Sequence, residues 1–329
     1  MYESVSTQLL KLLESVTFVS CTTDIWSTSQ CTDSLLSVTA HWIDGQWVRR
    51  AALLAASPVI GSHTAENIKT VVTAVIAKWN LNGKVHLFVR DNAKNITNGL
   101  CDAGVSSLSC ISHTLQLCVK RGLASQRAVS DALAVGRQVA THFSHSVLAK
   151  EKLESIQQTL SSVPEHRIIQ DVSTRWNSTF YMAQRLTEQK RSLSLYAADN
   201  TLPLPDANQW MLLDRATTIL APIERATKDV SAESSTASDV IPLVIGIKRA
   251  LQLLTNDTGV QTMKKEILDD MNVRFSTVSS EPLYAIATLV DPRYRGKLLS
   301  QSELAQARQW LVDAVTAVPV PDTVSQEEV

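Results

Sequence analysis

The chain has 329 residues, of which 44% are hydrophobic, so it is long enough for one large domain or two ordinary ones with a buried core. Its formal net charge of -1 excludes a basic surface over the whole chain, and any surface for nucleic acid must be a local patch or lie outside this sequence. The five cysteines form no C-x-x-C pair, which argues against a disulfide framework and favours a reducing compartment, cytosol or nucleus. We expect neither a signal peptide nor a membrane segment, because the start is polar and the longest apolar stretch is short.

The first part of the chain predicts strands and helices in alternation. Three strands come first, rich in β-branched residues or bounded by turn signals, at residues 16–24, 34–43 and 46–57. Asp44 and Gly45 supply the turn between the second and the third. Helical spacing of apolar residues from Ile68 to Trp79 then predicts a helix. A strand, a helix, a strand and a further helix follow, at 85–89, 92–103, 108–111 and from 113. This order predicts an α/β fold with a mixed sheet.

From about residue 126 the pattern is almost entirely helical. The expected helices span residues 126–143, 147–160, 176–198, 207–230, 240–254, 263–275 and 302–317. The last twelve residues contain two prolines and become acidic, which is typical of disorder. We therefore predict three regions: a core with the sheet at 1–125, a helical domain at 126–317 and a disordered tail at 318–329.

Two aspartates stand at the ends of predicted strands. Asp24 ends the first strand and Asp91 follows the fourth. If these strands are parallel neighbours, both carboxylates emerge at one edge of the sheet, where α/β folds place their sites. Magnesium prefers oxygen ligands and keeps several waters, so two or three carboxylates suffice to bind it. The alternative is that each aspartate only ends its strand or caps the next helix.

Several segments, taken in order, resemble the hAT superfamily of DNA transposases and the zinc finger BED domain-containing proteins derived from it. They are TTDIW at 22–26 with SVTAHWI at 37–43, DNA-x-N at 91–95 with C-x-x-HTLQL at 110–117, DV-x-TRWNST at 171–179, and a weaker ATLVDPRY at 287–294. The resemblance spans roughly residues 16 to 298. It implies a ribonuclease H-like mixed sheet core with a large all-α insertion domain.

The resemblance also implies roles for individual residues. Asp24 and Asp91 match the first two acids of an Asp-Asp-Glu site that binds Mg²⁺ or Mn²⁺. Trp26 and Trp176 match aromatic positions near the DNA end, where a ring can replace the stacking lost by a flipped base. Core packing is the alternative for both tryptophans. Arg175 could bind a phosphate through its guanidinium fork, or could be a solvated arginine at a helix start.

Cys110, His113 and Asn92 are expected in the neighbourhood of this site. The C-x-x-H spacing of the first two could supply two zinc ligands, but a closed structural site needs four, and no second pair stands at suitable spacing. We therefore expect no zinc within this chain. The pair is better explained as structural residues beside the two aspartates.

The sequence also departs from the family pattern. The third acid, in a serine-rich S-x-x-x-E-R stretch of a C-terminal dimerisation segment, has no match, and Glu224, Glu281 and Asp291 are the candidates to replace it. The BED finger has no match either. Two acids leave a pair of metals short of ligands, so we expect no strand cleavage by this chain alone. We also expect a homo-oligomer only where the dimerisation segment is present.

Three functions remain open on the sequence alone. The first is a metal-dependent core for DNA cleavage and strand transfer. The second is a domesticated, non-catalytic nuclear protein that binds DNA or protein as a regulator or scaffold. The third, a purely helical interaction scaffold, would leave the three-strand meander and both strand-end aspartates to chance. We favour a transposase-derived, DNA-binding nuclear protein that is inactive as isolated.

Overall fold

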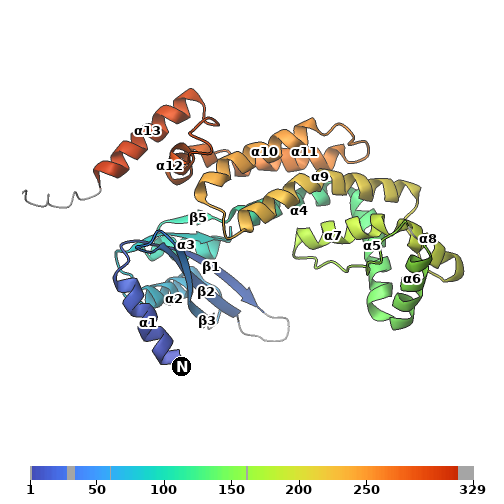
Figure 1. Cartoon of the computed structure of the whole chain (residues 1–329), viewed down its shortest axis with the longest axis horizontal. Helices are drawn as coiled ribbons and strands as arrows, with labels where there is room; N and C mark the ends of the chain where they lie inside the picture. The colour runs from blue at the N-terminus through green and yellow to red at the C-terminus, as the bar shows by residue number, and fades with distance from the viewer. Residues whose placement is uncertain (1, 28–33, 60, 161, 318–329) are drawn as a thin grey trace, which may run out of the picture. The chain divides into compact units, whose positions relative to one another are not determined.

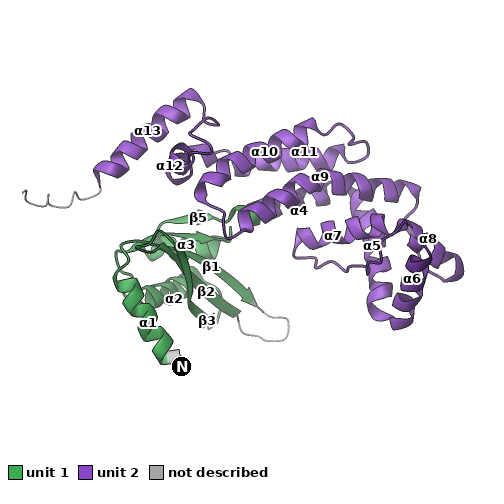
Figure 2. Ribbon diagram, viewed as in Figure 1, with its two compact units in different colours: residues 1–114 green, residues 115–329 purple. Residues whose placement is uncertain are grey.

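The computed structural model describes residues 2–27, 34–59, 61–160 and 162–317. The chain divides into two compact units, residues 1–114 and 115–329, which are described separately below (Figure 2). This division falls inside helix α4 (Ile111–Ser125), whereas the sequence placed the change after residue 125. The predicted disordered tail at 318–329 lies outside the described residues, as does Cys31.

Unit 1 is built on one mixed sheet. Its elements are α1 (Tyr2–Glu14), β1 (Val19–Ser27), β2 (Ser34–Ile43), β3 (Arg49–Val59), α2 (Ala65–Lys78), β4 (Val85–Arg90), α3 (Lys94–Asp102) and β5 (Ser107–Ser109). The five strands have the order β3-β2-β1-β4-β5 (Figure 1). The first three are antiparallel neighbours, and β4 and β5 run parallel to β1. The predicted α/β fold with a mixed sheet is therefore confirmed, while the sequence did not predict α1.

One face of this sheet carries the hydrophobic core of unit 1. Alternate residues of β2 are buried, from Leu36 through Val38 and Ala40, because side chains of a strand point to opposite faces in turn. They join a cluster with residues of α2 and α3, such as Ile68 and Leu100, so these two helices cover this face (Figure 1). The intervening residues of β2, among them Ser37, Thr39 and His41, lie on the opposite face and are less buried.

The hairpin between β2 and β3 turns at Asp44, as the sequence predicted, but with a different geometry. The Asp44 Oδ1 atom accepts hydrogen bonds from the backbone N–H groups of Gln46 and Val48, both at 2.9 Å. The residue with a left-handed backbone is Trp47, with φ 62°, and Gly45 has no positive φ. Glycine is the residue that usually occupies such a position, so the turn places a bulky side chain where none is favoured.

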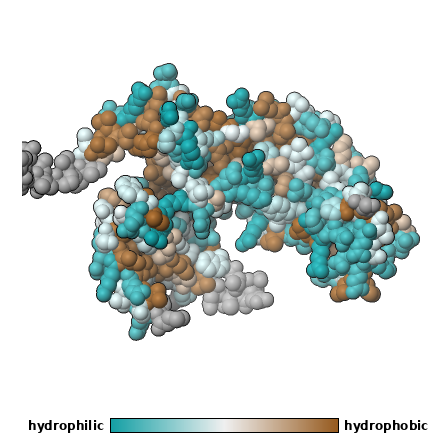
Figure 3. All heavy atoms as spheres, in the orientation of Figure 1, coloured by the Kyte–Doolittle hydropathy of each residue, from teal (hydrophilic) through white to brown (hydrophobic). Residues whose placement is uncertain are grey.

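Unit 2 is entirely helical in its described part. After α4 it contains α5 (Arg127–His145), α6 (Val147–Thr159), α7 (Trp176–Glu188), α8 (Lys190–Asp199), α9 (Ala207–Ser231), η1 (Ala237–Asp239), α10 (Val240–Leu253), α11 (Gln261–Arg274), η2 (Val278–Ser280), α12 (Pro282–Val290) and α13 (Gln301–Thr316). The sequence did not predict α12. Helix α13 leaves Val312 and Val315 exposed, and Figure 3 shows hydrophobic surface along it. No helix within the described ranges is both long and apolar enough to span a membrane.

The single helix predicted at 176–198 is two helices, and the break falls at Gln189. This side chain is fully buried. Its Nε2 donates to the Pro164 carbonyl at 2.8 Å, and its Oε1 accepts from Gln157 Nε2 at 2.8 Å. A buried amide must satisfy its hydrogen bonds, and these partners are distant in sequence, so local periodicity could not predict the break.

Two helical glycines of unit 2 give opposite predictions for the same substitution. A Cβ atom added at Gly122 in α4 would overlap Ile267 Cγ1 and lie 2.9 Å from the Met263 carbonyl oxygen, whereas one at Gly246 in α10 would meet nothing within 4 Å. We expect Gly122→Ala to lower the free energy of unfolding by about 2 kcal/mol through overpacking. Gly246→Ala should raise it by about 0.5–1 kcal/mol, since alanine favours the helix.

Urea denaturation followed by circular dichroism at 222 nm measures both changes. A Gly122→Ala protein as stable as the Gly246→Ala protein would contradict the packing of α4 against α11.

Candidate functional site

The site begins with the parallel pairing of β1 and β4. The last pair in register is Thr22 with Val89, and Asp24 and Asp91 each lie two residues further along the chain. Neighbouring strands lie about 4.8 Å apart, and residues two positions apart share a face of the sheet. Asp91 directly follows β4, as predicted, whereas Asp24 lies within β1, three residues before its end at Ser27, and does not end the strand. Asp24 is exposed, on the face of β1 opposite buried Cys21 and Thr23.

Each aspartate uses one carboxylate oxygen in a local hydrogen bond. Asp24 Oδ1 accepts from the N–H of Ile25 at 2.9 Å, and Asp91 Oδ1 accepts from the N–H of Ala93 at 3.0 Å. The second oxygen of each carboxylate has no hydrogen-bond partner among the described residues. A purely local role, the alternative for both aspartates, thus accounts for only one carboxylate oxygen of each residue. The second carboxylate oxygen of each is available to a ligand.

The segment after Asp91 is tied to the start of α4. Asn92 Nδ2 donates to Thr114 Oγ1 at 2.9 Å, and Thr114 Oγ1 donates to the Cys110 carbonyl at 2.9 Å. Cys110 and His113 are half-buried. No group of three or more His, Cys, Asp or Glu suited to a metal ion occurs in the part of the chain that the structure describes. The hydrogen bond from Asn92 to Thr114 thus holds the segment after Asp91 against the start of α4. We call this edge of unit 1, with Asp24, residues 90–92 and Cys110 to Thr114, the rim.

Arg90, which the sequence did not single out, fixes the backbone beside Asp91. Its Nη1 donates to the Asp91 carbonyl at 2.8 Å and to Ser109 Oγ at 3.2 Å, and its Nε donates to Ser107 Oγ at 3.1 Å. Burial lowers the pKa of Arg90, and the charge of Asp91 opposes that shift. The only signal in the sequence for this positioning role is that Arg90 directly precedes Asp91.

The two predicted DNA-contacting tryptophans differ in burial. Trp26 is 39% exposed and lies two residues after Asp24, hence on the same face of β1. Trp176 is only 2% exposed and meets Phe180 edge to face, with ring centroids 6.4 Å apart. Its burial contradicts the predicted contact with a base, because the ring already packs in the core of unit 2. Core packing, the alternative, holds for Trp176.

The sequence motif around Trp176 is explained by a half-buried ion pair. Asp171, whose side chain is 2% exposed, binds Arg137 from α5, with Nη2 at 2.8 Å and Nε at 2.9 Å from Oδ2. Thr179 Oγ1 donates to the same oxygen at 2.8 Å. Burial by itself raises the pKa of Asp171, but these hydrogen bonds outweigh it and hold the pKa below its usual value. The pair anchors the turn that ends at exposed Arg175, the residue before α7.

Two of the acids considered as replacements for the missing third one already have partners in unit 2. Glu224 binds Lys228 at 2.7 Å and accepts a hydrogen bond from Tyr181. Asp291 binds Arg293 at 2.7 Å and accepts from Ser238 at 2.6 Å. Each carboxylate is thus neutralised by a neighbouring cation, as expected for structural ion pairs.

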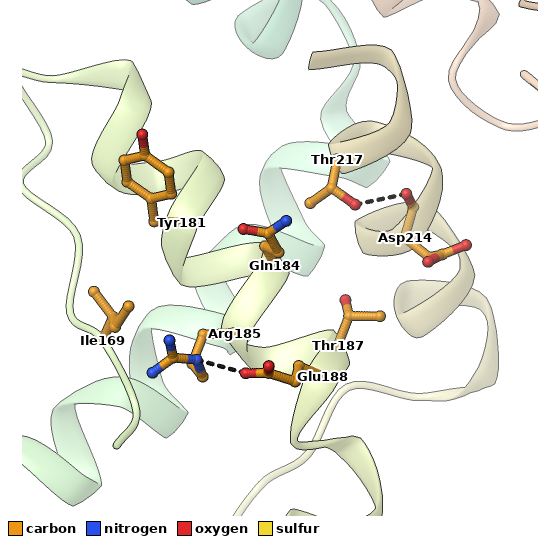
Figure 4. A pocket seen from close by; sticks show the side chains of 8 residues that line it. All are labelled: Ile169, Tyr181, Gln184, Arg185, Thr187, Glu188, Asp214 and Thr217. Atoms are coloured by element: carbon orange, nitrogen blue, oxygen red, sulfur yellow. Dashed lines mark hydrogen bonds and ion pairs between the residues drawn. The ribbon is translucent and has the colours of Figure 1, made fainter. Parts of the chain in front are cut away.

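Unit 2 also contains a polar cavity of about 540 Å³ lined by residues of α7 and α9 and by Ile169 from the segment before α7 (Figure 4). Its charged groups include Arg185 and Glu188, which form an ion pair at 2.7 Å, and Asp214, whose carbonyl accepts from Thr217 Oγ1 at 2.7 Å. The lining contains no cysteine or histidine. The cavity therefore offers no nucleophile with an adjacent histidine base, and the rim of unit 1 remains the candidate site.

Comparison with known proteins agrees with the division of the chain into unit 1 and unit 2. Residues 22–110 match the family described as the ZBED1 RNase-like domain, and residues 108–219 match the ZBED1 RNase-like helical domain. The chain thus pairs an RNase-like α/β domain with a helical one. It belongs to the hAT transposase-derived family of zinc finger BED domain-containing proteins, as its ordered motifs predicted.

Three relatives illustrate the similarity. Zinc finger BED domain-containing protein 4 of Homo sapiens is 33% identical over 303 residues, which are 88% of this chain and 26% of that protein. Zinc finger BED domain-containing protein 6 of Homo sapiens is 27% identical over 91% of this chain and 33% of its own length. The Putative AC transposase of Zea mays is 26% identical over 85% and 37%. The chain therefore spans well under half of each of these relatives.

The half-buried pair in unit 2 predicts a large cost for one substitution. Arg137→Ala leaves the Asp171 carboxylate, whose side chain is 2% exposed, without its cation, which should lower the free energy of unfolding by about 2 kcal/mol at neutral pH. Because the pKa of Asp171 is lowered in the folded state, the pair stabilises the protein above the ordinary carboxyl pKa. This contribution is lost as the pH falls through the folded value.

Arg127→Ala on the same helix is the matched control. Arg127 is 93% exposed and lies 3.7 Å from Asp131, so its removal should cost less than about 0.5 kcal/mol. Urea denaturation at pH 7 measures both proteins, and equal losses would rule out the anchoring role of the pair.

Proposed function

We propose that this chain is the DNA-binding core of a transposase-derived nuclear protein, in which Asp24 and Asp91 bind one hydrated divalent cation near the DNA backbone. The observation that carries the proposal is the parallel register of β1 and β4, in which the last pair, Thr22 with Val89, precedes each aspartate by two residues. A ribonuclease H-like arrangement of unit 1 is supported by its strand order and by the RNase-like name of the matched family. DNA as a partner is supported by relatives named as transposases.

The donor set at the rim fits a hard cation. Carboxylate oxygens are the ligands that Mg²⁺ and Mn²⁺ prefer, and Mg²⁺ characteristically keeps several waters with only one or two carboxylates. Asp24 and Asp91 each have an oxygen without a partner among the described residues. When bound, the cation would supply positive charge to a phosphate. The two aspartates hold it, and Asn92 and Arg90 keep the rim in position through their hydrogen bonds.

We propose that the chain alone does not cleave DNA. A pair of metals needs more negative ligands than two carboxylates. The described residues hold no cluster of three suitable side chains, and Glu224 and Asp291 are engaged by Lys228 and Arg293. A non-catalytic role as a regulator is the second candidate. It is favoured by a relative named Putative transcriptional regulator tpeD of Talaromyces stipitatus, 25% identical over 90% of this chain.

The DNA surface is proposed to include two exposed side chains. Trp26 lies on the same face as Asp24 and offers a ring to a base. Arg175 is exposed before α7 and offers its guanidinium to a phosphate. Each residue belongs to a separate unit and contributes on its own.

The proposal is tested by DNA binding measured through fluorescence anisotropy, with and without Mn²⁺, over a series of salt concentrations. We expect affinity to fall as salt rises, because bound phosphates release counterions. Mn²⁺ should raise the affinity roughly tenfold in the wild type, since the cation bridges the carboxylates and a phosphate. Asp24→Asn and Asp91→Asn should remove this gain, while Arg175→Ala should reduce the slope of log affinity against log salt by about 1.

Asp102→Asn is the control for the aspartates, because Asp102 is an exposed acid of the same unit at the end of α3. It should keep the full gain from Mn²⁺. A wild-type protein that does not bind DNA would end the proposal, and a gain that survives Asp24→Asn would remove the cation site from it.

A further inference from the structure

The tip of the hairpin between β2 and β3 presents a tryptophan to solvent. Trp47 is 86% exposed, and no other large hydrophobic side chain in the described ranges is exposed to this extent. A fully solvated indole is unfavourable in water, and tryptophan is enriched where proteins bind partners. The tip is outside the candidate site at the strand ends, since it lies at the opposite end of β2 from Ser37, the partner of Asp24.

The backbone at this position makes the tryptophan more costly still. Trp47 has φ 62°, in the left-handed region that bulky residues disfavour. Glycine would adopt this left-handed conformation without strain, yet the nearby Gly45 does not occupy the left-handed position of the turn. The turn therefore does not explain why residue 47 is a tryptophan. Residues kept in a strained conformation at the expense of stability are typical of functional positions.

Hydrogen bonds to Asp44 hold the tip in one conformation. Its carboxylate accepts from the N–H groups of Gln46 and Val48, and its carbonyl accepts from the N–H of Trp47 at 2.9 Å. The backbone hydrogen bond from Val48, followed by the side chain of Arg50, keeps the pKa of Asp44 below its usual value. The carboxylate stays ionised at neutral pH, and the ring is presented on a preorganised turn.

An arginine at the start of β3, three residues after Trp47, is bound to the same aspartate that holds the turn. Arg50 Nε donates to Asp44 Oδ2 at 2.7 Å, which fixes the side chain and leaves its two terminal NH₂ groups without a partner among the described residues. Asp44 is the only acid between residues 41 and 50, and its two oxygens are already used. The tip thus combines a flat aromatic surface with donors arranged for a phosphate.

We propose that this hairpin tip binds unpaired nucleotides of DNA, with Trp47 stacked on a base and Arg50 hydrogen-bonded to the neighbouring phosphate. The inference rests on the proposed function, in that it assumes that the chain binds DNA. Stacking on an exposed ring requires an open base face, which a duplex covers with its own base pairs. The guanidinium of Arg50, which binds the same Asp44 as the turn does, favours a nucleotide over an apolar pocket of a protein partner.

The test uses the full chain and a labelled single-stranded oligonucleotide of about 20 nucleotides, with its duplex for comparison. Trp47→Gly removes the ring and relieves the backbone strain, so its thermal midpoint should equal or exceed that of the wild type. Its affinity for the single strand should fall about tenfold or more, while its affinity for the duplex changes less than twofold. Trp47→Phe keeps an aromatic ring and should retain most of the single-strand affinity.

Leu148→Ala, which removes a side chain that is 71% exposed in unit 2, is the control and should bind as the wild type does. If Trp47→Gly binds the single strand as the wild type does while DNA binding persists, the hairpin inference fails and the proposed function stands. If the wild type binds neither DNA form, both fail. If both Trp47 variants lose the same affinity for both forms, stacking on an unpaired base is excluded.

Discussion

The parallel pairing of β1 with β4 is the constraint on which the candidate site depends. An antiparallel neighbour would bring the carboxyl end of one strand beside the amino end of the other, and Asp24 would then lie far from Asp91. A register shifted by one residue would turn one carboxylate toward the core. The observed register avoids both outcomes, because Cys21 pairs with Phe88 in the core and Thr22 pairs with Val89 on the other face. The buried residues of both strands therefore set the position of the acids.

Charged side chains have different partners at the rim of unit 1 and in the helical unit 2. At the rim, each aspartate keeps an oxygen without a partner, and the adjoining arginine binds backbone and serine oxygens. In unit 2, Asp171 is paired with Arg137 from α5, and Asp270 is paired with Arg121 from α4 and with Arg274 of its own helix. Paired carboxylates stabilise helix packing, whereas carboxylates left open can bind a ligand. This contrast, together with the parallel register, is why the rim is the stronger candidate.

Much of unit 1 could be predicted from the sequence, because its signals are local. Alternation and turn residues gave β2 at its observed bounds, and short apolar runs gave β4 within one residue. The position of Asp91 directly after β4 followed from these, whereas β1 was predicted to end at Asp24 and continues to Ser27. Helix α12 was missed because its residues are apolar on every side and carry no helical period, and α1 was missed because polar residues mask its leucines.

Other features depend on contacts between distant residues. The break at Gln189 needs Gln157 and Pro164, and the burial of Trp176 needs the helices packed around it. The left-handed backbone of Trp47 depends on the turn that the hydrogen bonds to Asp44 select. The sequence suggested a different turn, because Gly45 follows Asp44 directly. Resemblance to the family carried the roles of single residues further than periodicity could. It was misleading for Trp176, where the motif reflects packing around Asp171.

The central claim is that Asp24 and Asp91 converge on one cation, and anomalous diffraction from crystals soaked in Mn²⁺ tests it most directly. The account predicts one anomalous peak at the strand ends, about 2.2 Å from an oxygen of each carboxylate. A peak bound by only one of them, or carboxylate oxygens more than about 8 Å apart, would contradict it.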